Sequence, residues 1–584
     1  MTILSGQCGG KMENQADNQG MMGQGKNTVE GELTRRAHAL LQRLAQARPG
    51  DISVFLLVLV VAMGGAALAK GGFYIGKHEG DTLQLADIVL RIARGEWPHL
   101  DFMTPIGYLA MAPIALFVKL GAGIGHAIFY AQIMVALLLL PATVYVAMSR
   151  FSGLSRWLYA SFIMVLCLAL VHGETEVSLS ISMHYNRWAW AIAYLVVPLA
   201  VMAPPRDRPL AEGLILGLGV AALVLIKTTY VIALAPGIMV ALVARRRWGV
   251  IGVASVAGLM VAAAMTLAAG SAFWGAYLHD LEVVARSPIR PQPGQSFFSV
   301  AAAPAFILGT MALLAVVVFL RQSARMTEGL ALMLLMPGLI YIVFQNYGND
   351  PQWLLLVALM AFALRPGPGL RNPLGWDLRQ GLGLAGVVLL TLGAGSALNL
   401  AYSPLRHLAA PVKNTRPLIA GMAQHNDILA QKARVYAVNN SVAGDLPGSG
   451  YEAYAADAER SDKDKAVLLG ETLPVCEQQT GMSALFDAAV KDLDAAGFGG
   501  KRILAADLFS LFWLFGDYPP VKGAAPWYYG GLPGIENADY IFVPICPISK
   551  NVRATMLKAL AESKRQITVV RRTPVYILIE AKVP

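Results

Sequence analysis

Two acidic residues open the most polar loop of an otherwise apolar chain, and their position indicates proton-transfer chemistry. Glu79 and Asp81 stand just after His78, at the start of the segment HEGDTLQLADIVLRIARGEW. The residues behind Asp81 predict an amphipathic helix over 81–94 that lies along a membrane surface, because apolar side chains recur at helical spacing: Leu83, Leu85, Ile88, Val89 and Ile92. A carboxylate fixed there can act as a base on a lipid-linked substrate. It can equally cap the helix, so both interpretations stay open.

Four basic residues are candidates for holding a phosphate, because a phosphate in a low-dielectric site needs a cationic partner. Lys227 interrupts two short apolar runs, and Arg187 stands at the start of another run. Arg286 and Arg290 belong to a proline-rich loop. The alternatives are a lysine that snorkels at a helix end and arginines that are merely solvated. The polar loop 345–350 is either a sugar-binding loop or a plain turn.

The composition requires a membrane environment for these residues. Of 584 residues, 56% are hydrophobic and only 14% are charged, against about 25% charged in soluble domains. The deficit falls almost entirely before residue 402. The net charge of +10 comes from Lys and Arg scattered between apolar runs, so it indicates membrane topology and excludes a nucleic-acid track. Residues 1–50 are expected to form a disordered cytoplasmic tail without a cleavable signal peptide.

The apolar runs predict an α-helical polytopic membrane protein with about eleven transmembrane helices. One further run, 105–120, contains two prolines and is expected to lie in the outer interface, because counting it as a span would turn the basic loops outward. The break at Lys227 is interpreted as the turn of a hairpin. The N-terminus is then cytoplasmic and the C-terminus lies outside. The predicted spans are 52–69, 124–148, 155–172, 188–203, 210–226, 228–243, 249–274, 298–320, 329–345, 351–364 and 381–401.

The sequence divides into a membrane domain and a soluble domain. The membrane domain is expected over 51–402, with a first periplasmic loop over 71–125. Residues 403–584 alternate charged helix-like stretches with short β-branched runs, which predicts a C-terminal α/β periplasmic domain. Within it we expect a helix over 481–496 and strands over 502–505, 540–544, 567–570 and 575–579.

The four cysteines give no metal site. Cys476 and Cys546 lie in the soluble domain, where they either form a disulfide or stay as two buried thiols. Cys8 and Cys167 lie in the tail and in a predicted span, and neither the CxxC nor the HExxH pattern occurs.

The first loop resembles that of the polytopic glycosyltransferases of the GT-C fold, including the protein-mannosyltransferase-like group. In that family an early acidic residue precedes an amphipathic helix, a Gly-Glu-x-Pro turn ending in Asp-Phe, and a Thr-Pro or His-Pro start to a second surface helix. Here the corresponding residues are Asp81, Gly95-Glu96-Trp97-Pro98-His99-Leu100-Asp101-Phe102, and Thr104-Pro105-Ile106-Gly107. The general layout of many spans and an outer C-terminal domain is similar as well.

The resemblance implies sugar transfer from a polyprenyl-phosphate carrier to a glycan, lipid or protein on the periplasmic side of a bacterial inner membrane. Asp81 matches the catalytic carboxylate, which deprotonates an acceptor hydroxyl and gives inversion at the anomeric carbon. Glu79 and Asp101 are expected near the substrate, although Asp101 can instead structure the turn. The Lys227 break resembles a "Lys-x-x-(Tyr/Gly)" element of these transferases, which implies contact with the donor phosphate.

One departure from the family concerns the metal. The family often has a second acidic residue near the outer start of the fourth span, whereas this chain has His184-Tyr185-Asn186-Arg187-Trp188 there. His184 and Arg187 are therefore expected to contact substrate. Glu174 or Glu176 can supply the missing ligand beside Asp81 for a divalent ion such as Mg²⁺ or Mn²⁺, but no metal is assigned.

Two other classes of function compete with the transferase. A transporter or flippase usually places ionisable residues in mid-span or shows two repeated halves, and this sequence shows neither. A non-catalytic scaffold for envelope assembly would not need the pattern of the first loop. A glycan ligase or polymerase is the nearest enzymatic rival, but those enzymes carry their main functional loop late in the chain. The sugar and the acceptor stay open.

Overall fold

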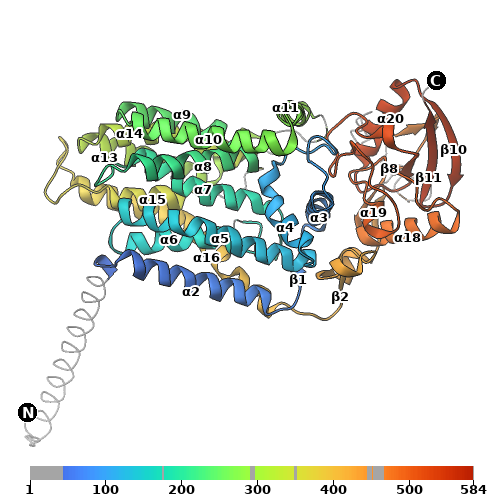
Figure 1. Cartoon of the computed structure of the whole chain (residues 1–584), viewed down its shortest axis with the longest axis horizontal. Coiled ribbons are helices and arrows are strands. Elements are labelled where there is room, and N and C mark those ends of the chain that lie inside the picture. The colour runs from blue at the N-terminus through green and yellow to red at the C-terminus, as the bar shows by residue number, and fades with distance from the viewer. Residues whose placement is uncertain are drawn as a thin grey trace, which may run out of the picture.

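The computed structural model describes residues 44–173, 176–287, 289, 296–346, 351–442, 450 and 466–582. A long bundle of helices forms one end of the molecule, and a domain with a β-sheet forms the other (Figure 1). The segment that follows the first bundle helix lies between these two parts and contacts both. This segment is the polar first loop of the sequence.

The bundle helices are apolar around most of their circumference. They are α2 (Pro49–Leu68), α5 (Ile124–Arg150), α6 (Gly153–Leu168), α7 (His184–Val201), α8 (Pro209–Ile226), α9 (Thr228–Ala244), α10 (Trp248–Ala269), α13 (Pro304–Gln322), α14 (Met326–Gln345), α15 (Trp353–Ala363) and α16 (Leu378–Ala409). Two shorter helices, α11 (Ala272–Ala285) and α12 (Phe297–Ala302), lie outside the main bundle. Leu267 in α10 is 88% exposed, which is expected of a leucine that faces lipid.

Seven of the described helices are long and apolar enough to cross a membrane, namely α2, α5, α8, α10, α13, α14 and α16. The prediction of a helical membrane protein is therefore confirmed. The helices α6, α9 and α15 are apolar but shorter. The 11 residues of α15 rise roughly 16 Å, which is about half the thickness of a bilayer core. The count of eleven spans thus stays a prediction.

The two short runs around Lys227 form a hairpin, as expected. Lys227 itself is extended (φ −159°, ψ 104°) between the end of α8 and the start of α9. Arg247, just beyond α9, donates to Glu212 in the first turn of α8 at 2.8 Å. The far ends of the two helices therefore lie side by side, and Lys227 marks the turn.

Ion pairs join the basic loops at one end of the bundle. Glu212 accepts hydrogen bonds from both Arg150 and Arg247, each at 2.8 Å, and Glu328 pairs with Arg245 at 3.1 Å. Leu44, the first of the described residues, reaches the same end, where its carbonyl accepts from Trp157 Nε1 at 3.2 Å. This end lies opposite the C-terminal domain (Figure 1).

The first loop contains the predicted amphipathic helix and no crossing segment. The helix α3 (Glu79–Ala93) matches the expected 81–94 closely. In the run 105–120, only a short 3₁₀ turn (Tyr108–Ala110) and α4 (Ala112–Lys119) are helical. Eight residues of helix rise roughly 12 Å, too short to cross a bilayer. That α3 lies along the membrane surface stays a prediction, and the structure adds that its polar side is buried as well.

A small mixed sheet ties the first loop to the C-terminal region. Strand β1 (Phe73–Ile75) pairs in parallel with β3 (Ile428–Gln431), which pairs antiparallel with β2 (Thr415–Pro417). The carboxylate of Asp427, just before β3, accepts hydrogen bonds from the backbone of Gly125 and His126 at the start of α5, at 3.0 and 2.9 Å. Strands far apart in the sequence thereby fix where the first loop begins.

The C-terminal domain is a small α/β fold, as predicted. Its main sheet has the order β10-β11-β9-β8, with β8 (Ile503–Ala505) parallel to β9 (Tyr540–Pro544) and antiparallel pairs elsewhere. The other members are β10 (Gln566–Arg572), β11 (Tyr576–Lys582), α18 (Met482–Ala495) and α20 (Lys550–Glu562). Short elements complete it: α17 (Lys432–Val435), β4 (Asn439–Val442), β5 (Val467–Leu468), β6 (Glu471–Thr472), β7 (Cys476–Thr480) and α19 (Phe512–Phe515).

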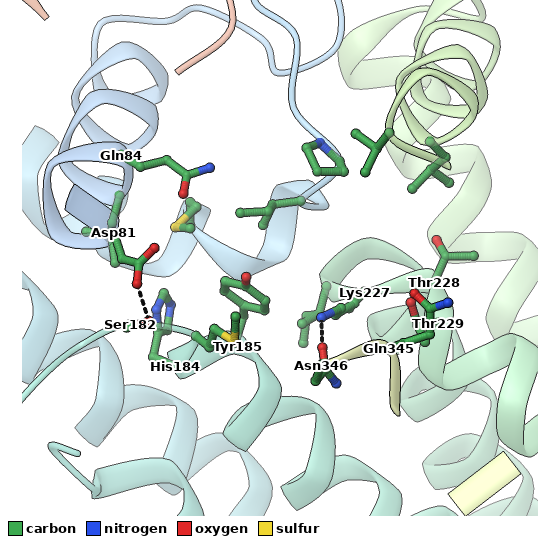
Figure 2. A pocket seen from close by; sticks show the side chains of 18 of the residues that line it. Asp81, Gln84, Ser182, His184, Tyr185, Lys227, Thr228, Thr229, Gln345 and Asn346 are labelled. Carbon is green, nitrogen blue, oxygen red and sulfur yellow. Dashed lines mark hydrogen bonds between the residues drawn. The ribbon is translucent and has the colours of Figure 1, made fainter. Parts of the chain in front are cut away.

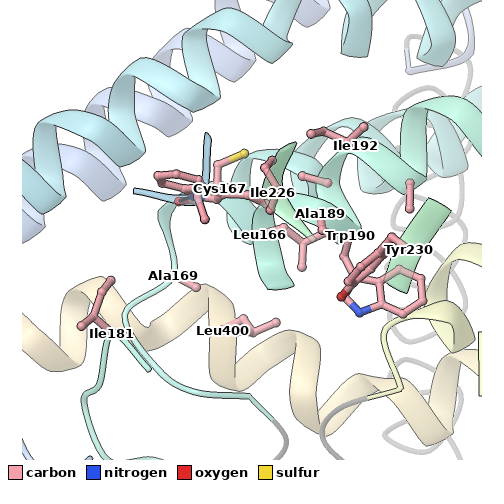
Figure 3. Close-up of a cluster of buried hydrophobic side chains, with 14 of the residues drawn as sticks. Leu166, Cys167, Ala169, Ile181, Ala189, Trp190, Ile192, Ile226, Tyr230 and Leu400 are labelled. Atoms are coloured by element: carbon pink, nitrogen blue, oxygen red, sulfur yellow. Dashed lines mark hydrogen bonds between the residues drawn. The ribbon is translucent and has the colours of Figure 1, made fainter. Parts of the chain in front are cut away.

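The bundle core fixes α7 against its neighbours. Leu166 and Cys167 at the end of α6, Trp190 in α7, Tyr230 in α9 and Leu400 in α16 belong to one buried cluster (Figure 3). The rings of Trp190 and Tyr230 meet edge to face at 5.3 Å. The Tyr230 hydroxyl donates to the carbonyl of Asn186 at 3.2 Å, so the start of α7 is held next to the Lys227 turn.

Cys476 and Cys546 form a disulfide, which resolves the two alternatives left by the sequence. Cys167 is a free buried thiol in α6, and Cys8 lies outside the described residues. The bridge joins the start of β7 to the loop after β9. Next to it, the buried Arg553 donates to the carbonyl of Pro544 at 3.0 Å.

We expect removal of this bridge by Cys476→Ser with Cys546→Ser to lower the stability of the C-terminal domain. The bridge closes a loop with a sequence separation of 70, so the loss is about 4 kcal/mol on loop-entropy grounds. Thermal unfolding of the purified protein, with and without reductant, measures it. Peptide mapping without reductant should recover the linked pair, and recovery of two free thiols from the native protein would contradict the bond.

Candidate functional site

A cavity of about 390 Å³ lies between the bundle and the first loop, and it contains both Asp81 and Lys227. Asp81 comes from α3, while Lys227 comes from the α8–α9 turn, and the two stand on opposite sides (Figure 2). The rest of the polar lining is uncharged: Gln84, Ser182, Thr228, Thr229, Gln345 and Asn346. Tyr529 of the C-terminal domain also lines the cavity, so all three parts of the molecule contribute to it.

Asp81 is the third residue of α3 and points toward the segment before α7 (Figure 2). The hydroxyl of Ser182 donates to Asp81 Oδ2 at 2.7 Å. The residue before α3 is His78, in a left-handed conformation (φ 63°), and no side chain caps this helix among the described contacts. Within the described chain, Asp81 thus makes no capping hydrogen bond, although its place in the first turn still complements the helix dipole. A carboxylate directed into a cavity also fits the interpretation as a base.

Lys227 is held inside the cavity by uncharged oxygens. Its ammonium donates to Asn186 Oδ1 at 3.1 Å and makes a second, shorter hydrogen bond to Asn346 Oδ1 (Figure 2). It also lies 5.4 Å from the centre of the Tyr185 ring. These contacts direct the ammonium into the cavity, which favours the phosphate-binding interpretation over a lysine that snorkels away from the site.

His184 lines the cavity as well, but it also has a structural contact. Its Nε2–H donates to the carbonyl of Ala110 at 2.9 Å. Its Nδ1 is buried and has no hydrogen-bond partner among the described residues. His184 therefore links α7 to the turn before α4 while presenting its ring to the cavity.

Glu79 and Asp101 lie outside the cavity lining and bind the C-terminal domain instead. Both oxygens of the Glu79 carboxylate accept from Arg434, one of them at 2.9 Å. Asp101 accepts from the backbone N–H of Trp97 at 2.9 Å and pairs with Lys522 at 3.3 Å. Of its two sequence interpretations, the turn-forming one fits this geometry, because the carboxylate closes its own loop.

The remaining predicted cations also lie apart from the cavity. Arg187 donates to the carbonyls of Val171 and Ala169 at 2.6 and 3.1 Å, so it braces the loop after α6. Arg286 pairs with Glu282 at 2.6 Å, and its side chain is 79% exposed. Arg290 lies outside the described residues, as do residues 347–350 of the polar loop.

The described residues do not gather a set of metal ligands. Glu176 pairs with Lys77 at 2.7 Å, and this hydrogen bond holds the pKa of Glu176 down, to about 2. Glu174 lies outside the described residues. Within the described chain, no three side chains of His, Cys, Asp or Glu come together as a metal site would require. We therefore derive no metal-dependent step from these residues.

Several lining residues are absent from the sequence prediction. Ser182 follows Ser180 at a spacing of two, a polar alternation that marks one face of an extended segment. Gln84 belongs to α3 one turn after Asp81 and was open to prediction from helical spacing. Nothing in the sequence places Tyr529 near Asp81, because only domain docking brings it there.

The C-terminal domain binds α3 next to the cavity. Trp513 Nε1 donates to Asp87 Oδ1 at 2.9 Å, and Arg94 lies over the Trp513 ring at 4.4 Å. Arg91 donates to the carbonyl of Val521 at 3.2 Å. Burial raises the pKa of Asp87 to about 6, although Arg91 and the Trp513 hydrogen bond oppose the shift.

An apolar groove of about 520 Å³ lies within the bundle. It runs between α8, α9 and α10, with Trp274 at its border. Val224 and Leu225 line the groove, while Ile226 and Lys227 line the cavity, so the end of α8 contributes to both although they share no described lining residue. The lining of the groove is almost entirely aliphatic, which suits a hydrocarbon chain.

Comparison with known proteins adds no relative: no family model, no curated protein and no solved structure matches this chain.

We expect Asp87→Asn to stabilise the protein more at pH 7 than at pH 5. A buried acid with a raised pKa binds its proton more readily when folded, so its contribution to stability falls as the pH rises through that pKa. Asparagine keeps an acceptor for Trp513 and removes this pH dependence. The difference between variant and wild type should change by roughly 1 kcal/mol between the two pH values. Thermal unfolding at both measures it, and a constant difference would contradict the assignment.

Proposed function

We propose that this protein is a membrane glycosyltransferase of the GT-C type, which moves a sugar from a polyprenyl-phosphate carrier to an acceptor hydroxyl. The observation that carries the proposal is the convergence of Asp81 and Lys227 on one cavity. They come from distant parts of the chain, and the transfer needs a base and a phosphate partner on opposite sides of one sugar. A helix cap and a snorkelling lysine would have no reason to face each other.

The reaction follows from these two positions. Asp81 accepts the proton of the acceptor hydroxyl while that oxygen bonds to the anomeric carbon. The bond between the anomeric carbon and the phosphate oxygen breaks, and its electron pair leaves with the phosphate. Lys227 stabilises the charge of the departing phosphate. Because attack and departure occur on opposite faces in one displacement, the configuration inverts.

The other lining residues suit a sugar. Amide and hydroxyl side chains, such as Gln84, Gln345 and Thr229, can exchange hydrogen bonds with sugar hydroxyls without adding charge. Tyr185 and Tyr341 offer aromatic faces. A polar cavity with a single described cation, Lys227, is matched to a monophosphate carrier.

The apolar groove supports a lipid-linked donor. Leu225 of the groove stands two residues before Lys227 of the cavity, so a carrier with its phosphate at the lysine would extend its hydrocarbon chain toward α8 and α10. A water-soluble nucleotide sugar would have no use for such a groove.

The orientation that fits best places the cavity and the C-terminal domain in the periplasm of a bacterial inner membrane. The basic loops gather at the opposite end of the bundle, where the positive-inside rule places the cytoplasm. The Cys476–Cys546 bond supports an oxidising compartment for the C-terminal domain. The described N-terminal residues share the basic end and are cytoplasmic in this orientation.

The first test is complementation of a deletion strain with wild type, Asp81→Asn or Asp87→Asn. Asparagine at 81 keeps the acceptor for Ser182 but removes the base, so we expect product formation to fall at least about 100-fold. Asp87→Asn makes the same change two turns along α3, outside the cavity lining, and should keep transfer. Intact masses of envelope glycolipids, polysaccharide fragments and surface proteins reveal the added sugar. Full complementation by Asp81→Asn would favour a transporter or a scaffold.

We expect Lys227→Ala to raise the donor concentration needed for half-maximal transfer by about 10- to 100-fold, because a charge-assisted hydrogen bond to phosphate contributes about 1.5–3 kcal/mol. Lys227→Arg should recover much of the loss. The assay uses polyprenyl-phosphate sugars extracted from wild-type membranes as donor and deletion-strain envelopes as acceptor. Lys119→Ala, at an exposed cation at the end of α4, is the control. Unchanged donor saturation in Lys227→Ala would refute the phosphate role.

A further inference from the structure

A chain of hydrogen bonds runs from Asp81 to a histidine outside the cavity lining. Ser182 Oγ donates to Asp81 Oδ2 at 2.7 Å. The same oxygen lies 3.2 Å from His172 Nδ1. His172 comes from the segment after α6, so the chain joins the first loop to a segment far from it in the sequence.

The direction of this chain follows from the chemistry of its members. An ionised carboxylate only accepts hydrogen bonds, so the one hydroxyl proton of Ser182 must point to Asp81. The serine oxygen is then an acceptor toward His172, whose Nδ1 must carry the proton. His172 therefore fixes the hydroxyl orientation that Asp81 needs.

The segment that carries His172 is braced on both sides. Its neighbour Val171 bridges to Leu179, and the Val171 carbonyl accepts from Arg187 at 2.6 Å. The backbone N–H of Ser182 donates to Ser180 Oγ at 3.0 Å. These contacts hold Ser182 and His172 in fixed positions relative to each other, so the chain of hydrogen bonds lies in a braced segment.

A second histidine extends the cluster. The His78 ring lies 4.9 Å from the His172 ring, and His78 Nδ1 lies 3.0 Å from Ser180 Oγ. His78 directly precedes α3. The two imidazoles therefore connect the start of the Asp81 helix to the braced segment.

We propose that His172 is a positioning residue that acts through Ser182 to hold Oδ2 of Asp81, leaving Oδ1 directed at the acceptor hydroxyl. Oδ1 has no hydrogen-bond partner among the described residues. The inference rests on the proposed transferase function, and it adds a residue that neither the sequence pattern nor the cavity lining identifies. During transfer the acceptor proton moves to Asp81 Oδ1, while Ser182 and His172 keep their own protons.

His172 can fill this position without adding charge beside the base. Burial, with smaller contributions from the neighbouring His78 and Arg187, lowers the pKa of His172 to about 4, although Ser182 and Glu176 oppose the shift. At neutral pH the imidazole is therefore a neutral donor. A charged donor there would weaken Asp81 as a base.

The test compares His172→Leu with His172→Asn in the extracted-donor and deletion-envelope assay. Leucine removes the donor to Ser182, whereas the asparagine amide nitrogen takes the place of Nδ1. We expect His172→Leu to lower the maximal rate about 10- to 100-fold with little change in donor half-saturation, and His172→Asn to recover to within about threefold of wild type. Ser182→Ala should match His172→Leu, and the double variant should be no worse than either, because both break one chain.

The controls separate this inference from the function on which it rests. Asp81→Asn is measured in the same assay, and its retention of transfer would overturn the proposed function itself. If Asp81→Asn is inactive while His172→Leu equals wild type, the function stands and the positioning role is wrong. Three further outcomes would also overturn the positioning role. They are loss of transfer in both His172 variants, additive effects of His172→Leu and Ser182→Ala, and a change confined to donor half-saturation.

Discussion

The burial of α3 on two sides is the constraint on which the rest of the site depends. It packs on α4, which contacts the bundle helix α5, while its polar side binds the C-terminal domain through Asp87, Arg91 and Glu79. A short amphipathic helix left on a bilayer surface would be free to tilt and slide. Because α3 is held between two parts of the protein, it has a single position. Asp81, in its first turn, is therefore directed into the cavity.

The same contacts show what the C-terminal domain does for the membrane part of the chain. The β1–β3 pairing fixes the start of the first loop, and Asp427 fixes its end against α5. Tyr529 then closes part of the cavity wall. The C-terminal domain therefore both holds the first loop in place and contributes to the wall of the cavity.

The bundle supplies the opposite wall through a break in a helix. The backbone of Lys227 is extended between α8 and α9. This non-helical conformation lets its ammonium reach Asn186 and Asn346. Irregular backbone within a membrane protein is tolerated where it lines a polar cavity, because the cavity can satisfy the released groups. The aliphatic groove between α8, α9 and α10 is lined in part by residues of α8 close to this break.

The sequence alone determined the membrane class, the amphipathic helix of the first loop, the hairpin break at Lys227 and the strands of the C-terminal domain, since each follows from hydropathy or local periodicity. It also singled out Asp81 and Lys227 by residue type. Only the tertiary structure brought these two together, paired Cys476 with Cys546, and assigned Glu79 and Asp101 to domain docking. Such contacts join segments that are between 70 and several hundred residues apart, and no local pattern encodes them. Ser182 and His172 became visible for the same reason, because a hydrogen-bond chain exists only once its segments are side by side.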